Sequence, residues 1–275
     1  MPTALVTGAS TGIGRATALG LAAAGFTVLA GVRDAEAGES LRSAAGGGAL
    51  RPITLDVTDR AQIASAVQAV PDGRLDALVN NAGIGIGGPV ETLPEEDLRR
   101  QFDVNVFGQI AVTRALLPAL RAAHGRILFI SSIGGRVPMA FSAPYAASKH
   151  AIEAFADTLR VELHSSGVQV ALIEPGSVAT PIWDKSRSEA DRVQIPPELE
   201  PYYGKVPAAL DKVLEDTGRR GMPPEAVARA IERALKARRM RARYLVGRDA
   251  VAMLALKRVL PDRAFDGLVR RALRV

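Results

Sequence analysis

Short, continuously apolar runs alternate with segments of helical periodicity over the first 180 residues, and this alternation limits the possible folds most strongly. The runs do not alternate in polarity, which is typical of parallel strands buried on both faces. A helix between two such strands returns the chain to the same edge of the sheet. The sequence therefore predicts an α/β fold, a doubly wound parallel sheet with helices on both faces.

The expected elements can be placed by residue number. Strands are predicted at residues 3–7, 27–32, 51–55, 77–79, 126–130 and 169–173. Helices are predicted at residues 13–24, 35–45, 61–70 and 145–166, and residues 95–123 are expected to form two closely spaced helices with Pro118 in the second. Residues 181–221 are rich in Pro, charge and Tyr and are expected to be irregular. A helix at 224–239, a strand at 243–246 and short helices at 249–260 and 262–274 complete the chain.

The composition excludes several classes of protein. The chain has 275 residues, 48% of them hydrophobic, so it can bury a sizeable core. It has no Cys and three scattered His, so we expect no disulfide and no metal site. No signal peptide is visible, and no uncharged run approaches the ~20 residues of a membrane span. We therefore expect a cytoplasmic location.

The net charge of +6 is unevenly distributed. Residues 219–275 hold 16 Lys and Arg against 5 Asp and Glu, whereas the preceding 218 residues hold 19 against 24. A basic segment could meet nucleic acid, an anionic membrane or an acidic substrate. We favour a solvated helical surface, or a segment that caps the pocket or contacts a subunit. No nucleic-acid partner is expected, and membrane association is a less favoured alternative.

A glycine-rich turn joins the first predicted strand to the first predicted helix. Its sequence, residues 7–14, is Thr-Gly-Ala-Ser-Thr-Gly-Ile-Gly. Glycine allows a tight turn and a close approach of the backbone to a phosphate, and the helix N-terminus offers unpaired N–H groups. The spacing G-x3-G-x-G differs from the usual dinucleotide fingerprint G-x-G-x-x-G. Taken alone, this turn indicates either a nucleotide site or an ordinary strand-to-helix connection.

Three further motifs lie at or just beyond the ends of predicted strands. Residues 80–83 (Asn-Asn-Ala-Gly) end the fourth strand, and residues 175–176 (Pro-Gly) end the sixth. Ser132 precedes Tyr145 by 13 residues, and Lys149 follows Tyr145 by four. Together with the glycine turn, these motifs resemble the short-chain dehydrogenase/reductase family over residues 1 to about 180. The resemblance implies a Rossmann-type domain of about seven strands and NAD(P)-dependent oxidoreductase activity.

The resemblance also implies a catalytic tetrad of Asn105, Ser132, Tyr145 and Lys149, with Ser131 as the competing serine. Tyr145 and Lys149 are four apart and share one helix face. A free phenol has a pKa of ~10, and a nearby ammonium lowers it, so we expect Lys149 to lower the pKa of Tyr145. Tyr145 would then exchange a proton with the substrate oxygen. Ser132 would hydrogen-bond that oxygen, Lys149 would bind the nicotinamide ribose, and Asn105 would hold a relay water.

The cofactor is expected to be NADP(H) rather than NAD(H). The position where NAD-preferring relatives carry an acid is Val32, and Arg33 follows, where a guanidinium suits a 2′-phosphate. Asp34 lies close to the general position of a ribose acid, although it could instead cap the next helix. The residues expected to contact the cofactor, besides Tyr145 and Lys149, are Gly8, Ser10, Thr11, Gly12, Ile13, Gly14, Arg33, Asp56, Val57, Asn81, Ala82, Gly83, Pro175, Gly176, Val178 and Thr180.

The rest of the chain is expected to shape the substrate site. We interpret residues 1–275 as one catalytic domain, with a substrate lid at 181–221 and a C-terminal helical extension at 222–275. The lid holds Ile182, Trp183, Ile195, Leu199, Tyr202, Tyr203 and Val206, and Met139 and Phe141 are expected on the opposite wall. A hydrophobic ketone, aldehyde or alcohol is the expected substrate, and the motif order is similar to family members that act on steroid- or retinoid-like compounds. Those lid residues could equally only pack the lid onto the body.

Two other functions use the same scaffold. Epimerases and dehydratases share the Tyr-x3-Lys pair but usually carry a G-x2-G-x2-G turn and a larger substrate domain, neither of which this sequence has. A non-enzymatic NADP sensor or scaffold protein would be expected to lack Tyr or Lys, and both are present. Relatives commonly assemble through their two central helices, so a homodimer or homotetramer is expected.

Overall fold

A seven-stranded parallel sheet forms the centre of the molecule, with the strand order β3-β2-β1-β4-β5-β6-β7. The computed structural model describes residues 1–46, 49–182 and 195–273. The strands are β1 (Thr3–Val6), β2 (Thr27–Val32), β3 (Leu50–Thr54), β4 (Ala77–Asn80), β5 (Arg126–Ile130), β6 (Gln169–Pro175) and β7 (Arg243–Val246). The doubly wound parallel sheet predicted from the sequence is confirmed, and each predicted strand is present to within two residues.

The strands β1 to β6 each contribute to two separate hydrophobic layers because successive side chains point to opposite faces. Ala4 and Val6 of β1 pack into one layer, and Leu5 between them packs into the other. In β5, Leu128 joins the first layer, and its neighbours Ile127 and Phe129 join the second. The unbroken apolar runs in the sequence are therefore the consequence of helices covering both faces of the sheet.

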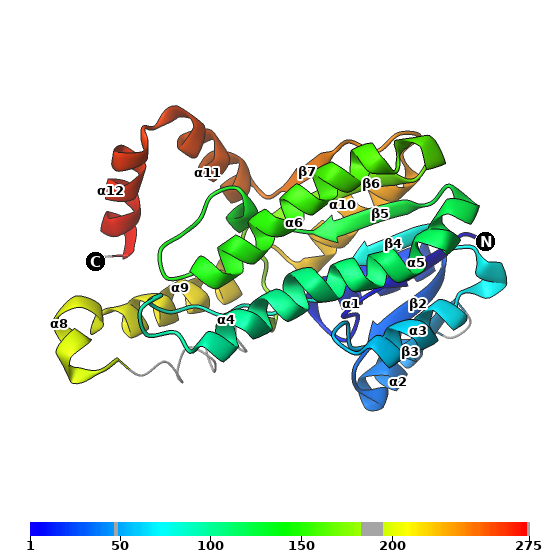
Figure 1. The fold of residues 1–275 in the computed structure, drawn as a ribbon, viewed down its shortest axis with the longest axis horizontal. Coiled ribbons are helices and arrows are strands. Elements are labelled where there is room, and N and C mark those ends of the chain that lie inside the picture. The colour runs from blue at the N-terminus through cyan, green and yellow to red at the C-terminus, as the bar shows by residue number, and fades with distance from the viewer. Residues whose placement is uncertain (47–48, 183–194, 274–275) are drawn as a thin grey trace.

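Helices cover the two faces in separate groups (Figure 1). One group is α1 (Gly12–Ala23), α2 (Ala35–Ala44) and α10 (Pro224–Lys236). The other is α3 (Arg60–Gln68), α4 (Glu95–Phe102), α5 (Gln109–Ala123) and α6 (Ala143–Glu162). A π-helical segment, Asp103–Gly108, joins α4 to α5 without a loop, and Pro118 lies inside α5. The two helices predicted at residues 95–123 therefore follow one another directly.

The segment expected to be irregular contains a helix, and that prediction is wrong. After α8 (Glu200–Tyr203), residues Val206–Arg220 form α9, which spans 15 residues. Its apolar side chains Val206, Leu210 and Leu214 recur at helical spacing, and its only proline occupies the first turn, where a missing N–H costs nothing. The density of Pro and charge in the sequence concealed this periodicity.

The C-terminal part adds to the sheet before it leaves the body. α10 packs against α1, and β7 pairs with β6, so both belong to the central layers. Two further helices, α11 (Arg248–Val259) and α12 (Asp262–Leu273), extend from the carboxyl end of β7 and project from the body (Figure 1). Within residues 1–46, 49–182 and 195–273, no helix combines the length and apolar character needed to cross a bilayer.

Candidate active site

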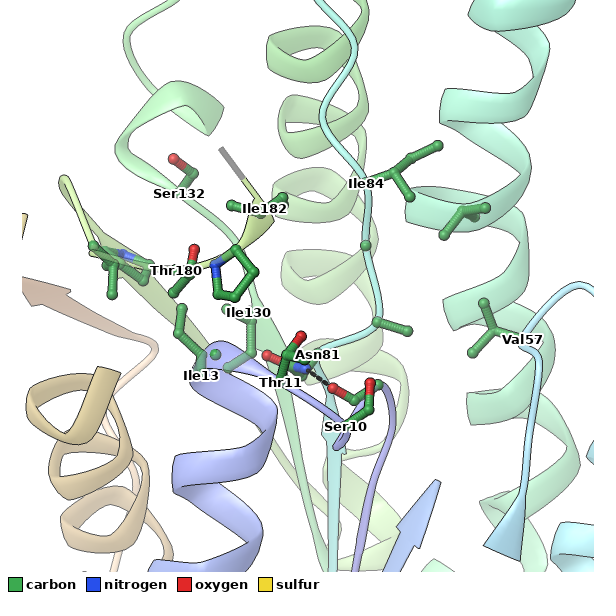
Figure 2. A pocket seen from close by; sticks show the side chains of 18 of the residues that line it. Ser10, Thr11, Ile13, Val57, Asn81, Ile84, Ile130, Ser132, Thr180 and Ile182 are labelled. Carbon is green, nitrogen blue, oxygen red and sulfur yellow. Dashed lines mark hydrogen bonds between the residues drawn. The ribbon is translucent and has the colours of Figure 1, made fainter. Parts of the chain in front are cut away.

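A cleft of about 190 Å³ opens at the carboxyl ends of β1, β4, β5 and β6. The strand order reverses between β1 and β4, and in open α/β sheets ligands bind at such a switch point. Nearly all of the predicted cofactor and catalytic residues line this cleft, although they come from segments far apart in the sequence (Figure 2). Among those predicted, only Gly14 and Asn105 do not line it.

The glycine turn approaches the loop after β4 so closely that side chains are excluded. Gly8 has a φ of +64°, and a Cβ on it would lie 2.9 Å from Ala82 Cα. Gly12 also has a positive φ, of +54°. A Cβ on Gly14 would lie 2.2 Å from the Gly8 carbonyl oxygen and 2.4 Å from Asn81 Nδ2. Glycine is therefore required for conformation at two positions and for space at the third.

Two polar side chains hold this turn, the buried Thr7 and the half-buried Asn81. The Thr7 hydroxyl oxygen accepts hydrogen bonds from the N–H groups of Asn81 and Ala82, both at 2.9 Å. In return, Asn81 Nδ2 donates to the carbonyls of Thr7 at 2.9 Å and Gly8 at 3.1 Å, the second of which Figure 2 shows as a dashed line. The turn and the loop after β4 are thus fixed as one unit, without any charged group.

The N-terminus of α1 is open toward the cleft. Thr11, which precedes the helix, makes no capping hydrogen bond with its side chain, and no acidic residue occupies the first turn. The first amide N–H groups of a helix have no intrahelical partner and favour an anion. A cradle without Cβ atoms beside these N–H groups fits the pyrophosphate of a dinucleotide. Gly8, Ser10, Thr11, Gly12 and Ile13 would hold it.

An exposed arginine, Arg33, lies at the end of the cleft beyond β2. Arg33 is exposed, lines the cleft, and has no acidic partner among the described residues. Asp34 instead caps α2, since its carboxylate accepts the Glu36 N–H at 3.1 Å. Val32, at the position where an acid would bind a ribose, is buried. This end therefore offers a guanidinium and no carboxylate from β2. Asp56 and Val57 line the cleft beside it.

Tyr145, Ser132 and Lys149 lie together in the cleft. Burial raises the pKa of the Tyr145 phenol, and a hydrogen bond with Ser132 opposes that rise. The expectation that Lys149 lowers the pKa of Tyr145 is therefore wrong. Lys149 Nζ lies 5.6 Å from the centre of the Tyr145 ring and donates to the Ile130 carbonyl at 2.7 Å, so its hydrogen bond goes to β5. Burial also lowers the pKa of Lys149 to about 8.

Asn105 lies behind the cleft in the π-helical segment. Its Oδ1 accepts the Ile84 N–H at 2.9 Å, and its Nδ2 donates to the Ile84 carbonyl at 3.0 Å and to Ser148 Oγ at 3.1 Å. The Ser148 hydroxyl in turn donates to the Tyr145 carbonyl at 2.7 Å. The Asn105 side chain therefore ties the loop after β4 to the helix that carries Tyr145.

The loop after β6 is held by a residue from α11. Asp249 Oδ2 accepts the Ser177 N–H at 2.7 Å. A Cβ on Gly176 would lie 2.3 Å from Asp249 Oδ1, and one on Gly247 would lie 2.5 Å from the same oxygen. Two glycines therefore make room for this carboxylate, which links the C-terminal helices to the Pro-Gly motif that lines the cleft.

Several residues of the cleft were not predicted. They are the lining residues Leu55, Ile84, Val104, Ile130 and Pro181. All are apolar and carry no motif, but each lies within a few residues of one. Ser131, the competing serine, lines the cleft together with Ser132. Ile182 was predicted from the lid segment and lines the cleft, whereas Met139 and Phe141 do not line it. Trp183 lies outside the described residues. Asp249 was also missed, because nothing near it in the sequence marks a contact with Ser177.

Comparisons with known proteins agree with this geometry. A family model described as short chain dehydrogenase matches residues 2–191. The chain is 36% identical to an NADPH-dependent 3-dehydrocapnine reductase of Ornithobacterium rhinotracheale, covering 98% of this chain and 97% of the relative. It is 39% identical to retinol dehydrogenase 5 of Mus musculus, covering 96% and 86%. A short chain dehydrogenase/reductase of Burkholderia phymatum, solved in complex with NAD, superposes with a TM-score of 0.80 at 27% identity, covering 94% and 92%.

Proposed function

The chain belongs to the short-chain dehydrogenase/reductase family and is an NAD(P)-dependent oxidoreductase, and on that premise we propose that it reduces a hydrophobic ketone or aldehyde with NADPH. The observation that carries the proposal is the grouping of Ser132, Tyr145 and Lys149 in the same cleft as the glycine turn. The nicotinamide supplies or accepts the hydride. The protein supplies orientation, exclusion of water and the proton.

Tyr145 is assigned as the general acid. Its raised pKa keeps the phenol protonated at neutral pH, which suits donation to the oxygen of a carbonyl that is being reduced. Ser132, which lines the cleft with Tyr145, would hydrogen-bond the same oxygen and stabilise its developing charge. The Lys149 ammonium would bind the nicotinamide ribose. Asn105 is assigned to hold a relay water, and its side-chain bonds support a role in fixing α6 as well.

NADP(H) is the proposed cofactor. The exposed Arg33 guanidinium, which has no acidic partner within residues 1–46, 49–182 and 195–273, suits a 2′-phosphate. Asp34 caps α2 rather than facing a ribose. One relative is named for NADPH and one solved structure contains NAD, so the preference rests on these residues of the chain itself. The remaining contacts are assigned to the residues of the cleft named above, with Gly14 supporting the turn from behind.

Aliphatic side chains in the cleft support an apolar substrate. Ile84, Val104 and Ile182 line the cleft with aliphatic surface, and Figure 2 labels Ile84 and Ile182. One relative is named for retinol, an apolar alcohol. We assign residues 181–221 to a lid, since Pro181 and Ile182 line the cleft and the Tyr203 hydroxyl donates to Glu91 on the body at 2.9 Å. Residues 222–275 are the C-terminal part of the same catalytic domain.

We also propose a cytoplasmic homo-oligomer. Phe107 in the π-helical segment and Phe155 and Val161 on α6 are large exposed apolar side chains on the central helices. A second copy packed on α5 and α6 would cover them. Sedimentation velocity should then show a dimer or tetramer at micromolar concentration, and a monomer there would contradict this part of the proposal.

The test uses the purified protein. NADPH and NADH are titrated separately and followed by nicotinamide fluorescence, and a panel of aliphatic and cyclic ketones and aldehydes is screened for oxidation of the tighter cofactor. We expect tighter binding of NADPH and turnover of apolar carbonyl compounds. If neither cofactor binds, the proposal fails. Tight binding without turnover of any carbonyl or alcohol would favour the sensor alternative.

A further inference from the structure

A buried ionic cluster lies behind Lys149, on the side away from the cleft. Glu153 on α6 and Glu174 on β6 are both buried, with 6% and 1% of their surface exposed. Arg243 of β7 joins them, with its Nε 3.0 Å from Glu153 Oε2 and 3.1 Å from Glu174 Oε1. Arg136 Nη1 lies 3.1 Å from the same Glu174 oxygen. Two buried carboxylates therefore share the Arg243 guanidinium, and Glu174 has Arg136 as a second cation.

Glu153 lies one helical turn after Lys149 on the same buried face of α6. Ser131 connects the two positions. A Cβ on Gly135 would lie 2.7 Å from Ser131 Oγ and 3.2 Å from Lys149 Cβ, so the serine hydroxyl and the lysine side chain border the same point. Burial raises the pKa of Glu153 and the Ser131 hydroxyl lowers it, although in the described part of the chain neither Ser131 Oγ nor Glu153 Oε1 has a partner that meets the geometry of a hydrogen bond.

The cluster contains more carboxylates than are needed to pair with Arg243 of β7. Arg243 already has an acidic partner at the surface, since its Nη2 lies 2.6 Å from Asp157 Oδ2. Glu174 has Arg136 as a second cation, whereas the only ion pair of Glu153 among the described residues is with Arg243, which it shares with two other carboxylates. Such a buried charge is costly unless another cation lies near it. Lys149, whose buried ammonium also needs a counter-charge, has Glu153 as its electrostatic partner.

We propose that Glu153 is a positioning residue for the reaction: its carboxylate, held by Arg243 behind Lys149, keeps the Lys149 amine in the ammonium form that the cleft requires. The expected effect on activity rests on the proposed function, whereas the effect of Glu153 on the protonation of Lys149 does not. Removing the charge of Glu153 lets Lys149 lose its proton at a lower pH, so the enzyme loses its alkaline range of activity.

The charged groups around Glu153 make the effect dependent on pH. On its own helix, Lys149 lies one turn before it and Asp157 one turn after it. Ser131 acts on it from the end of β5, Glu174 from β6 and Arg243 from β7, and Arg136 pairs with Glu174. Burial, together with the charge of Glu174, raises the pKa of Glu153 to about 7, against the influence of Ser131 and Arg243. Well below pH 7 its carboxyl is neutral and does little for Lys149. Its influence therefore appears only above neutral pH.

The experiment compares Glu153→Gln with Asp157→Asn. Both substitutions remove a carboxylate that pairs with Arg243, but Asp157 is two turns from Lys149. Below about pH 6 we expect Glu153→Gln to have the kcat/KM of the wild type. At high pH its kcat/KM should begin to fall about one pH unit lower than in the wild type, which is a roughly tenfold loss there. We call this fall the alkaline limb of the pH profile. Asp157→Asn should leave the limb in place, and Glu153→Asp should restore most of it.

A second readout does not depend on turnover. The chain has six lysines, so ¹⁵N-lysine NMR can follow the Lys149 Nζ signal, assigned by its loss in Lys149→Met. We expect Lys149 to titrate about one unit lower in Glu153→Gln than in the wild type. Equal titration curves in the two proteins overturn the inference even if the enzyme is active. A lowered Lys149 titration in a protein that turns over no carbonyl compound would uphold the inference and overturn the proposed function.

Discussion

The two walls of the cleft use different physical means. The glycine-turn wall, residues 7–14 with the loop at 80–83, is held by the Thr7 hydroxyl, the Asn81 amide and backbone groups, with no ion pair. The catalytic wall, formed by the end of β5 with α6 and β6, buries Lys149, Glu153 and Glu174 and half-buries Tyr145. The first wall depends on space and backbone direction, and the second on titratable groups kept out of water. The first should therefore be insensitive to pH and the second strongly dependent on it.

Tyr145→Phe should distinguish the roles of the two walls most clearly, because it should affect turnover and not cofactor binding. Removing the phenolic hydroxyl deletes the proton donor, and general acid catalysis is worth 10² to 10⁴-fold, so kcat should fall by roughly 10³-fold. NADPH affinity, measured by fluorescence titration, should change by less than about threefold because the glycine-turn wall is untouched. Full turnover in this variant would show that the acid has been assigned wrongly.

Gly14→Ala should damage the other wall. The added Cβ would meet the Gly8 carbonyl and the Asn81 amide at 2.2 and 2.4 Å, so the turn must shift. We expect NADPH binding to weaken by about 10²-fold and the free energy of unfolding to fall by about 1–3 kcal/mol. Gly20→Ala is the matched control in the same helix, because nothing lies within 4 Å of its Cβ position, and it should stabilise by about 0.5–1 kcal/mol.

Lys149→Met should show how much stability the protein loses by burying a charged amine in the catalytic wall. Burial disfavours the ammonium, and the lowered pKa of about 8 means that the folded state holds this proton less tightly than the unfolded state. Met should therefore raise the unfolding free energy at pH 7 by about 1–3 kcal/mol, while abolishing turnover. Because wild-type stability rises as Lys149 loses its proton above pH 8, the gap should narrow toward pH 10. A gap that is constant with pH in denaturant titrations would count against this account.

Arg33→Ala tests the outer end of the glycine-turn wall, where we expect the smallest effect. An exposed guanidinium contributes a charge-assisted hydrogen bond to a phosphate, worth about 1–2 kcal/mol. NADPH should bind roughly tenfold more weakly, and NADH should be unaffected. Arg42→Ala, which removes an exposed arginine paired with Glu39 on α2, should alter neither affinity. Equal loss for both cofactors would remove the argument for NADP preference.

The parts of the molecule that were predictable from sequence are those with local signals. The unbroken apolar runs predicted β2, β5 and β7 to the residue, and Asp34 was recognised as a possible helix cap, which it is. The glycine turn and the Tyr145–Lys149 spacing identified the cleft. Contacts across long sequence separations were missed, such as Asp249 with Ser177 or Arg243 with Glu153, since no period or spacing encodes them. The direction of the Tyr145 pKa was also missed, because burial depends on the whole fold.

The contact between Asp249 and Ser177 has a consequence for synthesis of the chain. The two residues are 72 positions apart, so at the usual 5–20 residues per second the ribosome adds Asp249 roughly 4 to 14 seconds after Ser177. During that interval β1 to β6 and all the assigned catalytic side chains have been synthesised, but the loop after β6 lacks its hydrogen bond to Asp249. The loop after β6, and with it the cleft that this loop lines, is therefore complete only after α11 has been made.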